Sequence, residues 1–71
     1  MKNINIIKIS GFYIKSIMDE PEVTWMITGD HYFDNQEELE ELRKDIKLTY
    51  EKYVGHVEVK TLEELVNTII I

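Results

Sequence analysis

The chain of 71 residues contains no cysteine, so it can form neither a disulfide nor a thiolate metal site, and it suits a reducing compartment. Its longest uninterrupted apolar run has three residues, as at Ile69–Ile71, whereas a membrane-spanning helix needs roughly 20. No segment joins a basic start, an apolar stretch and a small-residue cleavage site, as a secretory signal does. We therefore expect a cytoplasmic protein without a membrane partner.

Glycine and serine are scarce, and their positions exclude two classes of enzyme. The three glycines, Gly11, Gly29 and Gly55, stand far apart, and none begins a helix in the pattern of a phosphate-binding loop. The only serines, Ser10 and Ser16, have no histidine near them in the sequence, which argues against Ser-His-Asp catalysis. We expect no enzyme activity and no cofactor.

The apolar content is sufficient for one small core. Hydrophobic residues make up 44% of the chain and charged residues 31%, which is typical of a folded domain rather than of a disordered segment. A chain of this length buries only about 60% of the surface that its unfolded form exposes. We expect a single domain over residues 1–71 with a thin core.

Alternating apolar residues predict strands in the first half of the chain. Residues 3–9 and 12–18 alternate, and the Ser10-Gly11 pair between them either makes a tight hairpin or places a bulge within one long bent strand; we favour the hairpin. A turn over 19–22 contains a proline, and residues 23–28 form the next strand, which His31-Tyr32-Phe33 can extend.

Helical spacing predicts a long helix over 36–54 and a short one near the end of the chain. The long helix has a cap at Asp34 or Asn35, a stop at Gly55 and one apolar stripe: Leu39, Leu42, Ile46, Tyr50 and Tyr53. Residues 56–60 form a strand with Val57 and Val59 inward. The short helix follows a Thr61-x-x-Glu64 capping box and has its own stripe, made of Leu62, Leu65, Val66 and Ile69.

These elements predict an α+β fold. The order is βββαβα, or ββαβα if the first two strands are one. We expect a small antiparallel or mixed sheet of three or four strands, with one long and one short helix packed on one face.

A cluster of possible metal ligands is better explained by structural roles. Asp30, His31 and Asp34 are close in the sequence, and Glu38 could join them in holding a divalent cation. The segment lacks the alternating acids and the central glycine of a calcium-binding EF-hand loop. We therefore interpret His31 as a turn residue and Asp34 as a helix cap, and expect no metal site.

The aromatic residues predict core positions rather than a surface that stacks on bases. Phe12, Trp25, Tyr50 and Tyr53 lie on apolar faces of the expected elements, while Tyr13 and Tyr32 are candidates for exposure. Without a basic surface around such residues, phosphates are repelled. We expect no direct binding of nucleic acid.

The net charge of −6 is unevenly distributed. Residues 1–18 carry Lys2, Lys8 and Lys15 and no acid. Residues 19–41, here called the acidic segment, contain no base and nine carboxylates: Asp19, Glu20, Glu22, Asp30, Asp34, Glu37, Glu38, Glu40 and Glu41. If these carboxylates form one continuous exposed patch, they create a negative potential that favours a basic protein partner. Otherwise they form a solvated face.

Charge steers a partner, while aromatic anchors hold it. Tyr32 and Phe33 lie within the acidic segment and are the candidate anchors. The partner-binding residues that we predict are Asp30, Tyr32, Asp34, Glu37, Glu38, Glu40 and Glu41.

The composition also carries a resemblance. A short chain without cysteine, rich in Asn, Ile, Lys and Glu, with the segment Gly-Asp-His-Tyr-Phe-Asp-Asn-Gln-Glu-Glu-Leu-Glu-Glu-Leu, looks like the small proteins encoded by phages and mobile elements of low-GC bacteria. In size and acidity it is similar to anti-CRISPR inhibitors, several of which imitate DNA and occupy the basic groove of an effector nuclease. The resemblance covers overall character and transfers no residue. The chain departs from a full DNA mimic because its first strands are basic.

Two functions follow as hypotheses. The first is a phage-encoded, non-enzymatic inhibitor or modulator in the host bacterial cytoplasm, which uses the acidic segment to block a basic, nucleic-acid-handling protein such as a CRISPR effector nuclease. The second is a structural module that forms a homodimer through a sheet edge or through the apolar isoleucines at the end of the chain.

Overall fold

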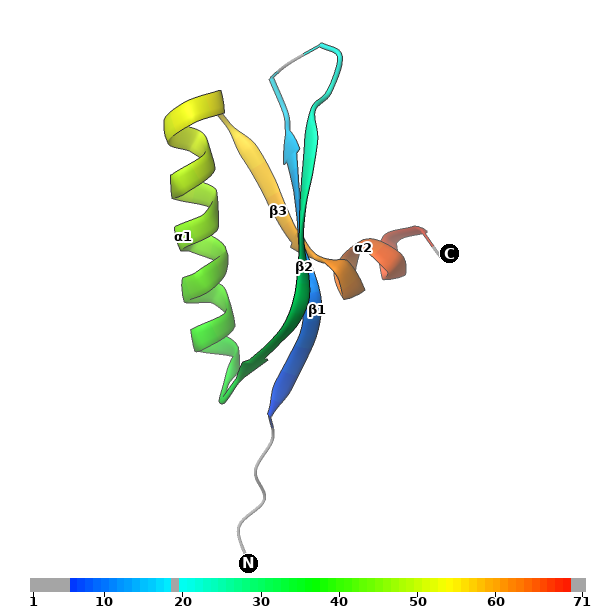
Figure 1. Cartoon of the computed structure of the whole chain (residues 1–71), viewed down its shortest axis with the longest axis vertical. Coiled ribbons are helices and arrows are strands. Elements are labelled where there is room, and N and C mark those ends of the chain that lie inside the picture. The colour runs from blue at the N-terminus through cyan, green and yellow to red at the C-terminus, as the bar shows by residue number, and fades with distance from the viewer. Residues whose placement is uncertain (1–5, 19, 70–71) are drawn as a thin grey trace, which may run out of the picture.

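The computed structural model describes residues 6–18 and 20–69, with the backbone alone at 68 and 69. The elements along the chain are β1 (Ile7–Ser16), β2 (Thr24–Phe33), α1 (Gln36–Val54), β3 (Val57–Thr61) and α2 (Leu62–Ile69). The strands form one antiparallel sheet in the order β2-β1-β3 (Figure 1). The α+β class and the order ββαβα are thereby confirmed. Our predictions for residues 3–5, Lys2, Asp19 and the isoleucine side chains at 69–71 lie outside the described part.

The central strand β1 is one bent strand, so the hairpin that we favoured within it is wrong and the alternative is correct. Ile9 lies opposite His31, but Gly11 lies opposite Thr28, so β2 contains one extra residue between these pairs. Gly11 has a φ of 143°, and a Cβ at this position would overlap the carbonyl oxygen of Ile27. Glycine is therefore required here for the strands to approach each other, rather than for a turn.

Helix α1 begins and ends where the sequence predicts. The side chain of Asn35 accepts a hydrogen bond of 2.9 Å from the backbone N–H of Glu38, and the carboxylate of Glu38 accepts one of 2.8 Å from the N–H of Asp34. Gly55 ends the helix with a φ of 85°. Both ends of α1 are set by local hydrogen bonding and backbone freedom, which a sequence shows directly.

The core lies between α1 and one face of the sheet. Its buried residues are Ile9, Phe12, Ile14, Phe33, Leu39, Val57 and Val59. Trp25 and Tyr50 pack against them, as predicted. Our placement of Tyr53 in the core is wrong, because its side chain is 81% exposed. Val54 takes that place, four residues after Tyr50, and packs against the core.

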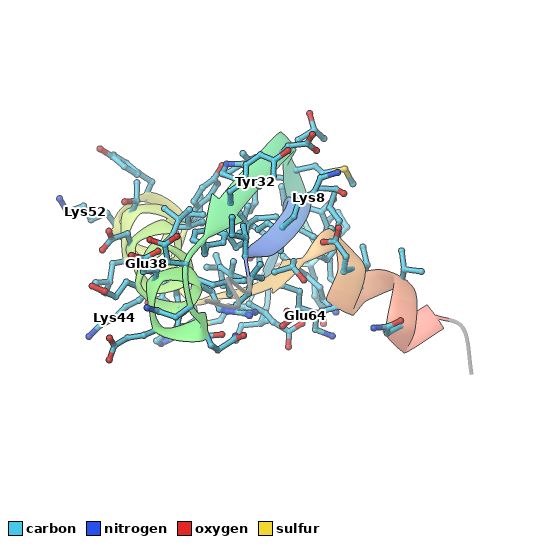
Figure 2. The ribbon with its side chains drawn as sticks, turned by 90° about the horizontal axis from the view of Figure 1, so that it is seen from below. Lys8, Tyr32, Glu38, Lys44, Lys52 and Glu64 are labelled. Carbon is cyan, nitrogen blue, oxygen red and sulfur yellow. The ribbon has the colours of Figure 1, made fainter. Side chains whose placement is uncertain are left out.

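Helix α2 lies on the other side of the sheet from α1, as the views along both axes show (Figures 1 and 2). The predicted capping box is present, with Thr61 and Glu64 exchanging two hydrogen bonds of 3.0 Å. Because α2 begins directly after the last residue of β3, the chain has no loop with which to turn back over the core. The expectation that both helices pack on one face therefore holds for α1 only.

Arg43 connects α1, β3 and α2. Its guanidinium donates hydrogen bonds to the carbonyl oxygen of Val59 at 3.1 Å and to both carboxylate oxygens of Glu64 at 2.6 and 2.8 Å. Glu40 lies 3.0 Å from its Nε. The Arg43 side chain is only 19% exposed, and its hydrogen bonds lower the pKa of Glu64 from 4.5 to about 2. This cluster ties α2 to α1 and β3, while Glu63 ties it to β1 by accepting hydrogen bonds of 2.9 and 2.8 Å from the N–H and hydroxyl of Ser10.

Acid should weaken the fold through Glu64. Because the pKa of Glu64 is lowered from 4.5 to about 2, its stabilising contact is fully present above pH 4.5 and is lost as the pH falls through 2. The Glu64 side chain is 45% exposed, so solvent screening leaves a contribution of about 1 kcal/mol. In urea unfolding, the stability difference between the native chain and Glu64→Gln should shrink as the pH falls through this window. A difference that does not change with pH would contradict the assignment.

In the part of the chain that the structure describes, no helix is long and apolar enough to cross a membrane.

Candidate functional site

The acidic segment does not form one continuous patch. Glu20 and Glu22 lie in the connection between β1 and β2, whereas Asp34, Glu37 and Glu38 lie around the start of α1, at the opposite end of the sheet (Figure 1). Strand β2, of ten residues, lies between them, and an extended strand of this length spans roughly 30 Å. The carboxylates of the acidic segment therefore do not form the continuous exposed patch on which the prediction of a basic partner depended.

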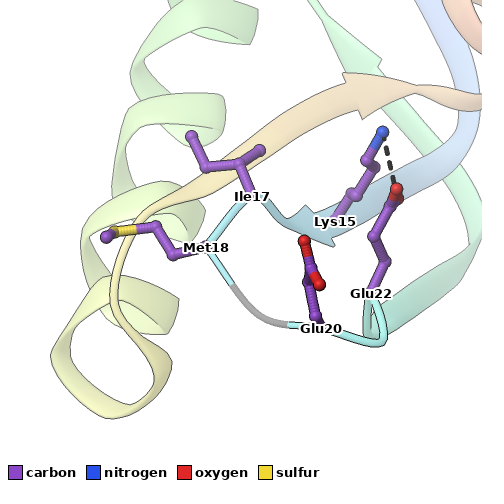
Figure 3. A pocket seen from close by; sticks show the side chains of 5 residues that line it. All are labelled: Lys15, Ile17, Met18, Glu20 and Glu22. Atoms are coloured by element: carbon purple, nitrogen blue, oxygen red, sulfur yellow. Dashed lines mark ion pairs between the residues drawn. The ribbon is translucent and has the colours of Figure 1, made fainter.

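Among the described acids of the segment, three are paired with bases. Lys15 lies 3.1 Å from Glu22, a contact that raises the pKa of the lysine (Figure 3). Lys8 lies 3.8 Å from Asp30. Glu40 is held by Arg43, as described above. The basic residues of β1 thus offset part of the negative charge that the sequence places on 19–41.

Apart from Glu20 in the β1–β2 connection, the described carboxylates that remain lie at the start of α1. We call Asp34, Glu37, Glu38 and Glu41 the acidic end; all four residues are exposed. No ion pair within the described ranges involves any of them. The helix cap is Asn35, so our interpretation of Asp34 as the cap is wrong; Asp34 only donates its backbone N–H to the carboxylate of Glu38. Glu37 and Glu41 are one turn apart on the solvent face of the helix. The last two are therefore the carboxylates most available to a partner.

The two candidate anchors have different environments. Tyr32 is 63% exposed near the end of β2, and Glu38 lies in the first turn of α1, which follows. Lys8 lies opposite Tyr32 in the strand register, so this end also carries one positive charge. Phe33 is only 8% exposed and belongs to the core. Tyr32 therefore remains a candidate anchor, and Phe33 does not.

The residues considered as metal ligands have structural contacts. Asp30 pairs with Lys8, and the Nδ1 of His31 is 2.9 Å from the carbonyl oxygen of Gly29. The His31 ring packs edge-on against Phe12, with their ring centroids 5.7 Å apart. His31 lies within β2 rather than in a turn. Within residues 6–18 and 20–69, no three acidic or histidine side chains are grouped to hold a metal ion.

Sequence reasoning missed an apolar hollow of 330 Å³ between β2 and the second half of α1. It is lined by Trp25, Thr49, Tyr50, Tyr53 and Val54, and the rings of Trp25 and Tyr50 are 5.3 Å apart. Tyrosine and tryptophan are the residues most enriched in binding hot spots. A signal was present in the sequence, because Tyr53 and Val54 both continue the helical stripe and two adjacent residues cannot both face the core.

A second hollow, of 260 Å³, lies at the β1–β2 connection. Its lining combines the exposed apolar side chains of Ile17 and Met18 with Lys15, Glu20 and Glu22 (Figure 3). Because Lys15 already pairs with Glu22, the uncompensated negative charge at this hollow is that of Glu20.

Comparisons of the chain with protein-family models, with curated proteins and with solved structures found no match.

Proposed function

We propose that this protein is a non-enzymatic inhibitor or modulator that binds a basic, nucleic-acid-handling protein through its acidic end and Tyr32. The observation that carries this proposal is the group of four exposed carboxylates at the start of α1, none paired with a base among the described residues. A bacterial effector nuclease as the partner, and a phage or mobile element as the source, follow from the resemblance in size and acidity. Asp30 and Glu40, which we also predicted to bind a partner, stay at the margin of this surface because each already contacts a base.

The geometry supports a smaller interface than the sequence implied. Exposed ion pairs contribute roughly 0 to 1 kcal/mol each and are screened by salt, so four carboxylates select and steer a partner more than they hold it. Tyr32 adds an exposed amphipathic ring near the end of β2, on the face of the sheet opposite to that of Phe33. The net charge of −6 also repels nucleic acid and favours a basic protein surface.

Neutralising the two most available carboxylates of the acidic end should sharply reduce partner capture without unfolding the chain. The test variant combines Glu37→Gln with Glu41→Gln, because neither side chain has a hydrogen bond or ion pair within the described residues that would be lost. We expect it to retain less than about a tenth of the nucleic-acid-binding proteins that the native chain captures from a bacterial lysate at low salt, and capture by the native chain to fall steeply as salt is raised. The readout is mass spectrometry of the captured proteins at two salt concentrations.

The matched control combines Asp45→Asn with Glu58→Gln. These exposed carboxylates lie in the middle of α1 and on β3, and their loss changes the net charge by the same amount. The control should capture as much as the native chain. Equal losses in both double variants would show that net charge rather than the acidic end is responsible, and retained capture in the Glu37/Glu41 variant would reject the proposal.

A further inference from the structure

The outer edge of β3 is closed by side chains from the two helices. The carbonyl oxygens of Val57 and Val59 accept hydrogen bonds from α1, and the N–H groups of Val57 and Thr61 donate to carboxylates. The four partners are Lys47 at 2.9 Å, Arg43 at 3.1 Å, Glu51 at 3.2 Å and Glu64 at 3.0 Å. A strand that approached β3 would have to displace charged groups from these bonds.

The outer edge of β2 is open. The N–H of Ser16 donates to the carbonyl oxygen of Val23 at 2.8 Å, and bonded and non-bonded pairs alternate along an antiparallel ladder. The outward N–H and C=O groups of β2 are therefore those of Thr24, Met26 and Thr28. Among the described residues, no side chain or backbone group of another element bonds to them.

The bulge in β2 between Thr28 and His31 interrupts this edge, and a bulge is one of the usual protections against pairing. Residues 24–28, before the bulge, contain neither proline nor lysine, which protect many other edges. The Met26 side chain is 57% exposed. The hollow beside Trp25 lies between the same strand and α1, so a strand added to β2 would turn alternate side chains towards it.

The charges along the edge indicate what kind of strand fits. Residues 23–29 are uncharged, whereas Glu20 and Glu22 precede them and Asp30 and Asp34 follow them. Glu22 and Asp30 already contact lysines of β1, so Glu20 and Asp34 leave one uncompensated negative charge near each end. An apolar segment flanked by basic residues would complement this pattern. A second copy of the chain would not, because antiparallel pairing of two β2 strands brings the acids at one end near those at the other end of the copy.

We propose that the open edge of β2 binds an extended, apolar segment of the partner that is flanked by lysine or arginine, and that one face of this segment fills the hollow beside Trp25. The proposal rests on the proposed function in one respect, that the partner is basic. Main-chain bonds to Thr24, Met26 and Thr28 would supply affinity, and the acids at both ends would set the preference for basic flanks.

The test uses a synthetic peptide with an alternating threonine-valine core of five residues and two lysines at each end. Binding is followed by the fluorescence of Trp25, the one tryptophan in the chain, and by amide hydrogen exchange. The peptide should protect the N–H groups of Thr24, Met26 and Thr28. A version N-methylated on the residues that face β2 keeps the charge and cannot pair, so it should bind at least about tenfold more weakly. A glutamate-flanked version should not bind.

The outcomes separate this proposal from the proposed function. Three results would each overturn the edge proposal: absence of peptide binding, equal binding of the N-methylated version, or binding without protection of the three amides. In each of these cases, dependence of lysate capture on Glu37 and Glu41 would still support the proposed function. Protection that grows with protein concentration in the absence of peptide would show that the occupant is a second copy, and would also overturn the edge proposal. Edge protection by the peptide, together with unchanged capture by the Glu37/Glu41 variant, would reject the proposed function alone.

Discussion

Replacing Gly11 with alanine should lower the free energy of unfolding by about 3 kcal/mol or more, and in a domain of this size that is a large part of the total. Two effects add at this position. The φ of 143° is one that residues with a side chain rarely adopt, and the added Cβ would overlap the carbonyl oxygen of Ile27. Because that oxygen belongs to the backbone of β2, relief requires the two strands to separate.

Gly29→Ala is the matched control for this experiment. Gly29 has a similar φ of 133°, but a Cβ there would meet no atom within 4 Å. This variant therefore keeps the backbone strain and removes the overlap, and it should cost about 1 to 2 kcal/mol. Urea unfolding of both variants gives the comparison. If the two substitutions cost the same, the close approach of β1 and β2 at Gly11 does not contribute to the requirement for glycine.

Arg43→Met should be the most damaging substitution of a charged residue, with a cost of about 2 kcal/mol. Methionine keeps much of the aliphatic stem, so the loss reports mainly the hydrogen bonds to Val59 and Glu64. Since this contact is one of the two that hold α2, the other being that of Glu63 with Ser10, the amides of α2 should exchange faster in the variant while those of β1 remain protected. The measurements are urea unfolding and amide hydrogen exchange.

Lys47→Met provides the comparison for Arg43. Lys47 also bonds a carbonyl oxygen of β3 and a carboxylate, in this case those of Val57 and Glu51. Its side chain is more exposed, however, and it contacts only one carboxylate. We expect a cost below about 1 kcal/mol and no faster exchange in α2. Similar effects of the two substitutions would mean that Arg43 does not have a special role in holding α2.

The features that sequence reasoning predicted correctly are those with local causes. The bounds of α1 follow from the cap at Asn35 and the stop at Gly55, and the capping box of Thr61 and Glu64 starts α2. Each of these helix ends depends on residues within one turn of each other, so the amino-acid sequence alone is sufficient to predict it. The alternation of Val57 and Val59 gave the inward face of β3 for the same reason.

The features that sequence reasoning missed depend on contacts between distant residues. Ser10-Gly11 has the composition of a turn, and only the carbonyl of Ile27, brought close by strand pairing, reveals why glycine is needed in a continuous strand. Tyr53 and Val54 both continue the apolar stripe of α1, and the position of the sheet under the helix decides between them. The side of the sheet on which α2 lies depends on the absence of a loop after β3.

Only the part of the candidate site at the start of α1 was predicted correctly, and strand geometry explains why. The acids that precede β2 and those that follow it lie at opposite ends of this extended strand, because each residue of β2 adds about 3.3 Å. Helical residues advance only about 1.5 Å each, so Glu37 and Glu41 stay together while Glu20 and Asp34 are separated. Charge counted along a sequence overestimates a surface patch wherever a strand lies inside the run.

The difference between the two sheet edges limits how many chains can assemble. A sheet with two free edges can add strands on both sides and grow into a filament without end. Here the hydrogen bonds made with the side chains of Arg43, Lys47, Glu51 and Glu64 occupy one side, so a strand can be added only beside β2. One copy of the chain therefore cannot pair through both edges of its sheet, and the head-to-tail growth of chain upon chain that this would allow is prevented.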